Sequence, residues 1–89
     1  MTRKVDGNQA IIVAALRAAG ASVQTLHEVG SGCPDLAVGH HGQTFLIEVK
    51  EPRSANRPTK AEREWFESWR GHAAVVTTPE QALRIIGVT

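Results

Sequence analysis

Two strand-like runs joined by a tight turn, over residues 35–50, constrain the fold more than any other part of this sequence. The run 35–39 is short and mostly apolar, His40-His41-Gly42 carries turn residues, and the run 43–50 alternates apolar and polar side chains. Alternation with a period of two is typical of a strand with one buried face, and a short turn between two such runs indicates a β-hairpin. We therefore expect two neighbouring antiparallel strands.

Three charged side chains fall together on this hairpin. In a strand, side chains two residues apart share a face and lie roughly 7 Å apart, so Glu48 and Lys50 point the same way. Asp35, at the start of the neighbouring strand, adds a second carboxylate. Taken singly, Asp35 is typical of a turn, and Glu48 with Lys50 is typical of a surface ion pair. Their order along the chain favours a shared site instead.

This set of groups suits the cleavage of phosphodiester bonds. The carboxylates of Asp35 and Glu48, with the Val49 carbonyl, are the hard oxygen ligands that Mg²⁺ prefers. A divalent cation neutralises charge on a phosphate and acidifies a bound water. Two roles remain open for Lys50. With a lowered pKa it orients or deprotonates the attacking water, and when protonated it stabilises the charge that develops on the phosphate.

The rest of the chain predicts a mixed α/β fold in one domain over residues 1–89. Apolar residues at helical spacing predict a first helix, which Asp6 or Asn8 caps and Gly20 ends. Thr59-Lys60-Ala61-Glu62 matches a capping box and opens a helix that stops at Gly71. The element order is αβββαβα. The other predicted elements are strands over 22–29 and 73–77, a turn over 30–34, and a last helix opened by a second capping box, Thr78-Pro79-Glu80-Gln81.

Composition narrows the class of protein. The net charge is only +1, which argues against a purely electrostatic binder of nucleic acid. The single cysteine, Cys33, excludes an intrachain disulfide framework and an all-cysteine zinc site. No apolar run reaches the ~20 residues that cross a bilayer, and the first residues carry no signal-peptide pattern. We therefore expect no membrane segment and a cytoplasmic location.

Positive charge is concentrated directly after the hairpin. From Lys50 to Arg63 the sequence has five basic residues and two acidic ones. Such an excess can hold a phosphate backbone, and a solvated loop explains it equally well. Ser31 lies in a glycine-rich turn whose N–H groups either cradle a phosphate or simply reverse the chain. If these segments contact nucleic acid, the contacting residues are Ser31, Arg53, Arg57, Lys60 and Arg63.

Together, Gly32-x-Pro34-Asp35, Glu48-Val49-Lys50 and the element order resemble the PD-(D/E)xK nucleases. The branch that the chain looks like, from about Asn8 to Ile86, is the single-domain virus-type replication-repair nucleases (VRR-NUC), which are commonly phage-encoded. The resemblance implies a restriction-endonuclease-like fold and a Mg²⁺- or Mn²⁺-dependent DNA endonuclease. It assigns Asp35, Glu48 and the Val49 carbonyl to the metal and makes Lys50 the catalytic lysine.

The same resemblance implies partners. Stand-alone members are expected to form homodimers similar to Holliday-junction resolvases and to favour branched DNA, such as four-way junctions or flaps. A dimer places two sites to cut two strands, which suits so small a chain. For a phage-encoded protein, the expected location is the host cytoplasm.

Two positions depart from the family pattern. Most members carry a glutamate on the first helix that completes the metal environment, but Asn8 or Gln9 stands there in this chain. Gln9 shares the apolar stripe of the helix, which favours it as the catalytic-site residue, holding a metal-bound water without adding charge. A cap or a hydrogen bond within the core explains Gln9 as well. Where some members have a glutamine after the lysine, this chain has Glu62 and Arg63.

Other chemically distinctive residues have ordinary structural explanations. Cys33 is expected to pack before Pro34 rather than to act as a nucleophile. His40 and His41 are expected at a solvated hairpin tip, with side chains that point apart. Trp65, Phe66 and Trp69 share a helix face and either stack on unpaired bases or form a core or dimer interface, which their spacing favours.

Two rival functions remain open from the sequence. The first is a non-cleaving DNA-binding module on a nuclease scaffold, which the absence of the expected glutamate from the first helix favours. The second is a small interaction protein whose tryptophan-bearing helix docks a partner. This second function requires Asp35, Glu48 and Lys50 to be dispensable.

Overall fold

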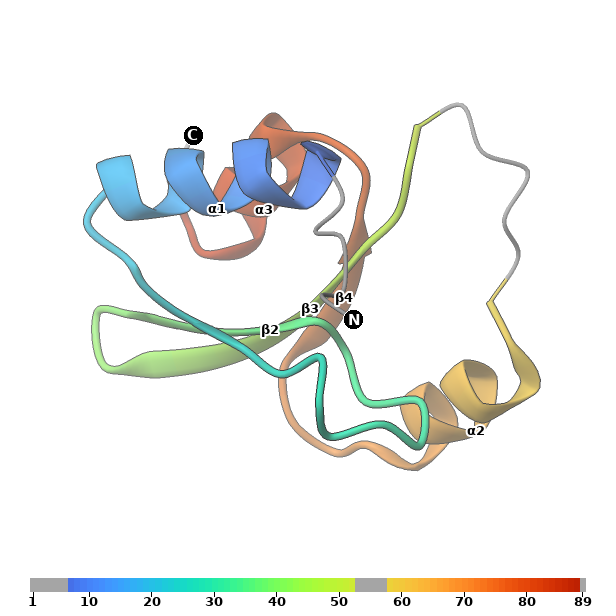
Figure 1. Cartoon of the computed structure of the whole chain (residues 1–89). Coiled ribbons are helices and arrows are strands. Elements are labelled where there is room, and N and C mark those ends of the chain that lie inside the picture. The colour runs from blue at the N-terminus through green and yellow to red at the C-terminus, as the bar shows by residue number, and fades with distance from the viewer. Residues whose placement is uncertain (1–6, 53–57, 89) are drawn as a thin grey trace.

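The computed structural model describes residues 7–52 and 58–88, and Figure 1 shows how they are arranged. These residues form the predicted order αβββαβα. The elements are the helices α1 (Gly7–Ala18), α2 (Lys60–Ser68) and α3 (Pro79–Ile85) and the strands β1 (Ser22–Thr25), β2 (Leu36–His40), β3 (Gln43–Val49) and β4 (Ala73–Val76).

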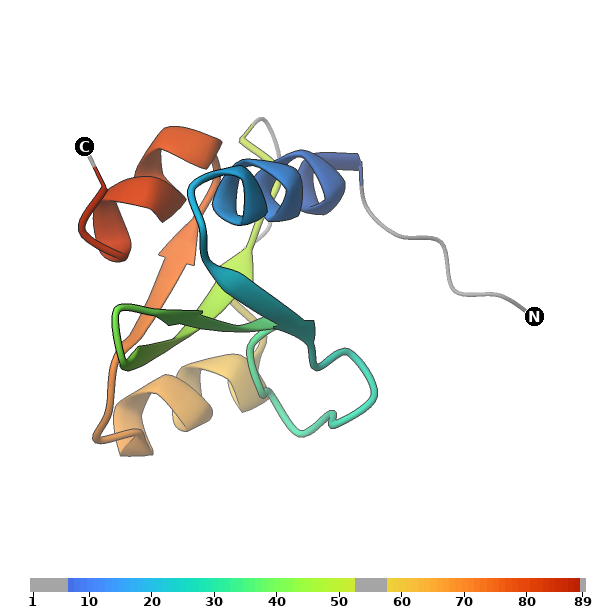
Figure 2. The ribbon, with the colours of Figure 1, turned by 90° about the vertical axis from the view of Figure 1, so that its left-hand side faces the viewer.

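The four strands form one mixed sheet in the order β1-β2-β3-β4. The first three strands pair antiparallel, whereas β4 runs parallel to β3. A parallel neighbour requires a crossover connection, and α2 lies within it. Figure 2 shows α1 and α3 on one side of the sheet and α2 on the other. The predicted mixed sheet flanked by helices is therefore confirmed.

The hydrophobic core lies between the sheet and the pair α1 and α3. In β2 and β3 the buried apolar side chains alternate with the others, so only one face of the hairpin enters this core. Helix α1 buries Ile12 and Leu16 against it, and α3 buries Ala82. The strand residues that complete the core are Leu36, Val38, Phe45, Ile47, Val49 and Val76.

The hairpin register brings the two candidate acids together. Leu36 pairs with Ile47 across β2 and β3, so Asp35 and Glu48, the next residues outward, lie side by side. His41 and Gly42 form the turn with φ values of 50° and 78°, the positive values typical of a two-residue hairpin turn. A tight local turn therefore sets the distance between the acids.

The first strand is shorter than predicted. It ends at Thr25 instead of Val29, after one further hydrogen bond from the Leu26 N–H to the Asp35 carbonyl (2.7 Å). Beyond this point the facing chain is the turn before Asp35, in which Pro34 has no N–H to donate. Without a partner strand, the chain turns away and Val29 is exposed.

The expectation of a solvated histidine pair at the hairpin tip is wrong for His40. As the last residue of β2, His40 continues the core-facing alternation and is only 9% exposed. The two rings do not point apart, because the left-handed backbone of His41 turns its ring onto that of His40, with centroids 4.0 Å apart.

Both helix caps form at the predicted residues. The Thr59 side chain accepts from the Glu62 N–H, and the Glu62 carboxylate accepts from the Thr59 N–H, which completes the capping box of α2. At α3, the Thr78 side chain accepts from the Gln81 N–H, but the Gln81 side-chain oxygen Oε1 accepts from the N–H of Thr77, one residue earlier than predicted. None of the helices in the described ranges is long and apolar enough to span a membrane.

Candidate active site

Asp35 is held between the ends of two strands. Its carbonyl oxygen accepts from the Leu26 N–H, and its carboxylate oxygen Oδ2 accepts from the Val49 N–H at 2.9 Å. The turn that leads into it has positive φ at three successive residues, Gly30, Ser31 and Gly32. Backbone hydrogen bonds therefore hold both the main chain and the carboxylate of Asp35 in place.

Glu48 is a buried acid on the face of β3 that points away from the core. It is 5% exposed, although its neighbours Ile47 and Val49 fill the opposite, apolar face. Burial, and then the negative charges of Asp35 and Glu62, raise the pKa of Glu48 to about 7. A bound cation would remove this repulsion, so the site favours positive charge.

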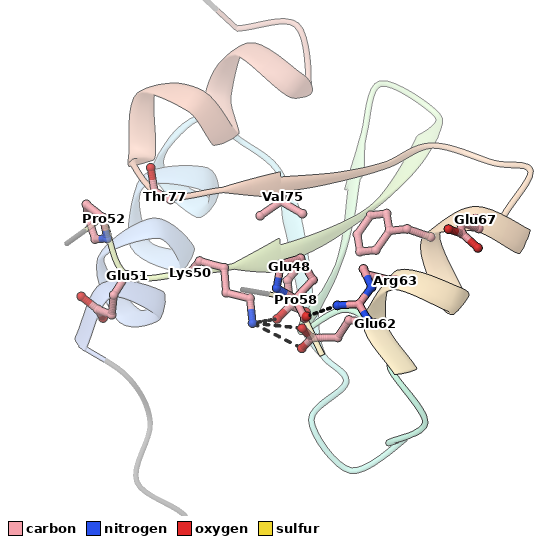
Figure 3. Close-up of a pocket in the computed structure, with 11 residues that line it drawn as sticks. Glu48, Lys50, Glu51, Pro52, Pro58, Glu62, Arg63, Glu67, Val75 and Thr77 are labelled. Atoms are coloured by element: carbon pink, nitrogen blue, oxygen red, sulfur yellow. Dashed lines mark hydrogen bonds and ion pairs between the residues drawn. The ribbon is translucent and has the colours of Figure 1, made fainter. Parts of the chain in front are cut away.

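Lys50 lies between two carboxylates, as Figure 3 shows. Its Nζ atom is 3.2 and 3.3 Å from the two oxygens of Glu62 and 3.4 Å from Oε2 of Glu48. Burial lowers the pKa of Lys50, but the hydrogen bond to Glu62 and the charges of both acids outweigh it, so the pKa is raised. The two acids therefore favour the ammonium form of Lys50, and the lowered pKa considered for Lys50 beside a bound metal stays a prediction.

Glu62 is a residue of the site for which the sequence predicted a place in the helix cap but no catalytic role. One carboxylate both accepts from the Thr59 N–H and binds Lys50. Burial raises the pKa of Glu62, but the hydrogen bonds from Thr59 and Lys50 outweigh it and lower the pKa. The capping box fixes the Glu62 side chain at the start of α2. The signal in the sequence for a role in the site was the place of Glu62 after Lys50, where some family members have a glutamine.

The backbone of β3 supports the predicted role of the Val49 carbonyl. The Lys50 N–H donates to the Val76 carbonyl on β4, whereas the Val49 N–H donates to Asp35 on the opposite side. Since the N–H and C=O of one strand residue point to the same side, the Val49 carbonyl also faces the side of Asp35. Two carboxylates and one carbonyl therefore lie together at the open end of the hairpin, opposite its turn.

This donor set fits a magnesium-type ion. Across residues 7–52 and 58–88, no three histidine, cysteine, aspartate or glutamate side chains group together as metal ligands. Mg²⁺ does not require such a cage, because it keeps several waters and binds through one or two carboxylates together with substrate phosphates. Asp35 and Glu48 would hold it. Burial and the repulsion from neighbouring carboxylates raise the pKa of Glu48, and a bound cation would relieve that repulsion.

The first helix approaches the site through Asn8 rather than Gln9. The Asn8 side-chain amide donates to the Lys50 carbonyl at 2.8 Å and to the Thr77 carbonyl at 3.1 Å. Gln9 instead lines a separate hollow between α1 and β1, with Thr25 and His27. Consecutive helix residues point about 100° apart, so placing the site residue at Gln9 was off by one position.

The predicted nucleic-acid contacts are distributed unevenly. Arg63 lines the same pocket as Glu48 and Lys50 and donates to the Pro58 carbonyl at 2.9 Å. Lys60 and Ser31 are exposed, at the start of α2 and in the turn before Asp35. Arg53 and Arg57 lie outside the described residues.

Cys33 lies beside the acids but is unsuited to nucleophilic attack. Burial, and then the charges of Glu48 and Asp35, raise the pKa of its thiol. The thiolate is the nucleophilic form, so this environment disfavours the reactive state. The expectation of a packing role remains the simpler one.

Comparison with known proteins agrees with this fold. No family model and no curated protein matches the sequence. A solved structure described as a "VRR_NUC domain" is similar to this chain, with a TM-score of 0.62, 29% sequence identity and 88% of each chain covered. The chain therefore has the fold of that VRR_NUC domain.

Proposed function

We propose that this protein is a divalent-metal-dependent DNA endonuclease that hydrolyses phosphodiester bonds. The observation that carries the proposal is the convergence of Asp35, Glu48 and the Val49 carbonyl beside an ammonium group, Lys50, that two carboxylates hold in place. This set is incomplete without a cation and a phosphate. A metal ion supplies the missing positive charge, and the substrate phosphate completes its ligands.

Each residue has a distinct task in this proposal. Asp35 and Glu48 bind Mg²⁺ or Mn²⁺, which, when bound, neutralises the phosphate and acidifies a water. The ion pairs with Glu48 and Glu62 favour the ammonium form of Lys50, which stabilises the negative charge that develops on the phosphate. Glu62 holds the Lys50 ammonium on the side of Glu48. Asn8 fixes the backbone at the end of β3 through the Lys50 carbonyl.

The finer parts of the proposal concern the substrate and the assembly. The substrate is branched DNA, such as a four-way junction or a flap, and the protein acts as a homodimer. Helix α2 supports the second point: it buries none of its residues, and Trp69 is 44% exposed. Trp65 and Trp69 stack on each other with centroids 4.7 Å apart, leaving an apolar surface for a second copy.

A test of the proposal uses the purified protein with Mg²⁺ or Mn²⁺ and a panel of four-way junction, flap, duplex and single-stranded DNA. Asp35→Asn and Glu48→Gln remove the metal-binding charges, and Glu64→Gln is the matched control, because Glu64 lies exposed on α2 away from the site. We expect cleavage by the wild type and the control and its loss in both site variants. Equal cleavage by all four proteins would contradict the assignment of the site.

One observation favours a second function, a non-cleaving DNA-binding module. The first helix brings an amide, Asn8, to the site instead of a carboxylate, so the metal would be bound by two acids only. Binding of DNA that needs no divalent metal, with no cleavage of any substrate, would support this alternative.

A further inference from the structure

A pocket of about 510 Å³ opens beside the candidate catalytic residues. Glu48 and Lys50 form one wall, α2 forms another, and Val75 and Thr77 of the last strand and its end complete it (Figure 3). The cleavage chemistry proposed above uses only the edge of this space. Its remaining walls contain Phe66 and Val75, and Val75 is 50% exposed although it is a β-branched apolar residue in a strand.

We propose that this pocket receives one unpaired nucleobase of the DNA, adjacent to the phosphodiester bond that is cleaved. This inference rests on the proposed nuclease function and adds a substrate subsite to it. The volume lies within the range of about 300–1,000 Å³ typical of small-molecule sites. A base within a stacked duplex cannot enter a hollow on one side of the sheet, whereas an unpaired base can rotate out at little cost.

The walls provide the surfaces that a base requires. Phe66 lines the pocket, and the flat faces of bases stack on aromatic side chains regardless of sequence. Val75 provides apolar contact from the sheet. The guanidinium of Arg63, which also lines the pocket, is held by the Pro58 carbonyl and offers a second planar group.

Charge decides between a base and a phosphate as the occupant. The lining has four carboxylates, Glu48, Glu51, Glu62 and Glu67, against two cations, Lys50 and Arg63. A cation bound at Glu48 offsets that acid, and Lys50 is paired with Glu62. In the rest of the pocket Glu51 and Glu67 stand against Arg63, and this negative charge repels a phosphate but accepts a neutral base, whose amino groups can donate to carboxylates. The cleaved phosphate therefore lies at the rim with Lys50, and the base attached to the neighbouring sugar lies inside.

This subsite gives a physical reason for selectivity among DNA structures. Flaps and bulges contain unpaired nucleotides next to a backbone that can be cut, and a continuous duplex does not. A requirement for one unpaired base would therefore favour branched DNA through the site of each protomer. It requires no recognition of the shape of the whole junction.

The test removes single bases from the DNA. After the cut position has been mapped on a flap, each nearby unpaired nucleotide is replaced in turn by an abasic one, and the cleavage rate is measured. We expect one position at which the loss of the base slows the wild type by about tenfold, the scale of one base–aromatic stack. Phe66→Leu should abolish this dependence. Ile11→Leu, at an exposed position of α1 outside the pocket, should retain it.

Binding provides a readout that does not depend on cleavage. A DNA with the fluorescent base 2-aminopurine at the same unpaired position should be quenched on binding to the wild type and to Ile11→Leu, but not to Phe66→Leu. If cleavage proceeds with no sensitivity to any abasic position, the base pocket is wrong and the nuclease stands. If no DNA is cut, the nuclease proposal fails, and the fluorescence alone decides whether the pocket takes a base.

Discussion

The two faces of the sheet differ in what holds their helices. Against one face, α1 and α3 bury apolar side chains such as Ile12, Leu16 and Ala82, none of which is accessible to solvent. Against the other, α2 buries no residue and is tied to the sheet by Glu62 and Lys50. The first face carries the stability of the domain, and the second carries buried charge and an open pocket.

The site is therefore assembled by polar contacts between side chains rather than by the packing of apolar ones. Glu48 and Ile47 are consecutive in β3, yet one lies among acids and the other in the core. The alternation of a single strand therefore separates stability from chemistry. Substitutions on the two faces should therefore differ in how they change the free energy of unfolding and the cleavage rate.

The largest loss of stability should follow truncation in the closed core. Leu16→Ala, which removes a side chain with no exposed surface, should lower the free energy of unfolding by about 2–5 kcal/mol. Val75→Ala on the open face should change it by less than about 0.5 kcal/mol. Urea unfolding of the two variants measures both values. Similar losses in the two variants would contradict the assignment of stability to the face that carries α1 and α3.

Gly32 controls how closely α2 approaches the turn before Asp35. A β-carbon there would overlap the Ala61 carbonyl, and φ is +80°. Gly32→Ala should therefore cost about 3 kcal/mol, of which backbone strain alone accounts for about 1–2 kcal/mol. Gly30→Ala, with φ of +75° but open space around it, isolates that strain. Cleavage should fall more in Gly32→Ala than in Gly30→Ala, because only the former moves Glu62; equal losses would contradict this.

The buried acid should make stability depend on pH in the absence of metal. Burial and the charges of Asp35 and Glu62 raise the pKa of Glu48 from 4.5 to about 7. Between these pH values the unfolded chain releases its proton before the folded one, so stability falls as pH rises and levels off above about 7. We expect a fall of about 3 kcal/mol in the wild type relative to Glu48→Gln, measured by urea unfolding from pH 4.5 to 8. A parallel pH profile in the two proteins would refute it.

The smallest of these effects concerns the position of Lys50. Glu62→Ala frees the ammonium group from one of its two carboxylates and should slow cleavage by about tenfold, or about 1.4 kcal/mol. Thr59→Ala is the control, because it removes the cap from the Glu62 N–H but leaves the carboxylate that binds Lys50. Its cost should appear in stability, at about 1 kcal/mol, and not in the rate. If Thr59→Ala slows cleavage and Glu62→Ala does not, the role of Glu62 is limited to the helix cap.

The sequence was sufficient for the hairpin and insufficient for the contacts between distant elements. The alternation of 43–50 and the turn residues before it predict the register that places Asp35 beside Glu48, because both signals are local. The link from Lys50 to Glu62 depends on how α2 docks, and the close approach of Ala61 to Gly32 is a tertiary contact that no periodicity encodes. The choice of Gln9 over Asn8 failed because one residue of helix phase decides which side chain reaches the strand end.

Metal binding without DNA tests the central claim most directly. A calorimetric titration of the purified protein with Mn²⁺ at pH 8 should show binding by the wild type and by Glu64→Gln. Binding by Asp35→Asn and by Glu48→Gln should be at least about tenfold weaker. Affinity should also rise from pH 6 to pH 8, because Mn²⁺ requires the ionised Glu48 carboxylate. Unchanged Mn²⁺ affinity in Glu48→Gln would contradict the assignment of the open face as a metal-dependent site.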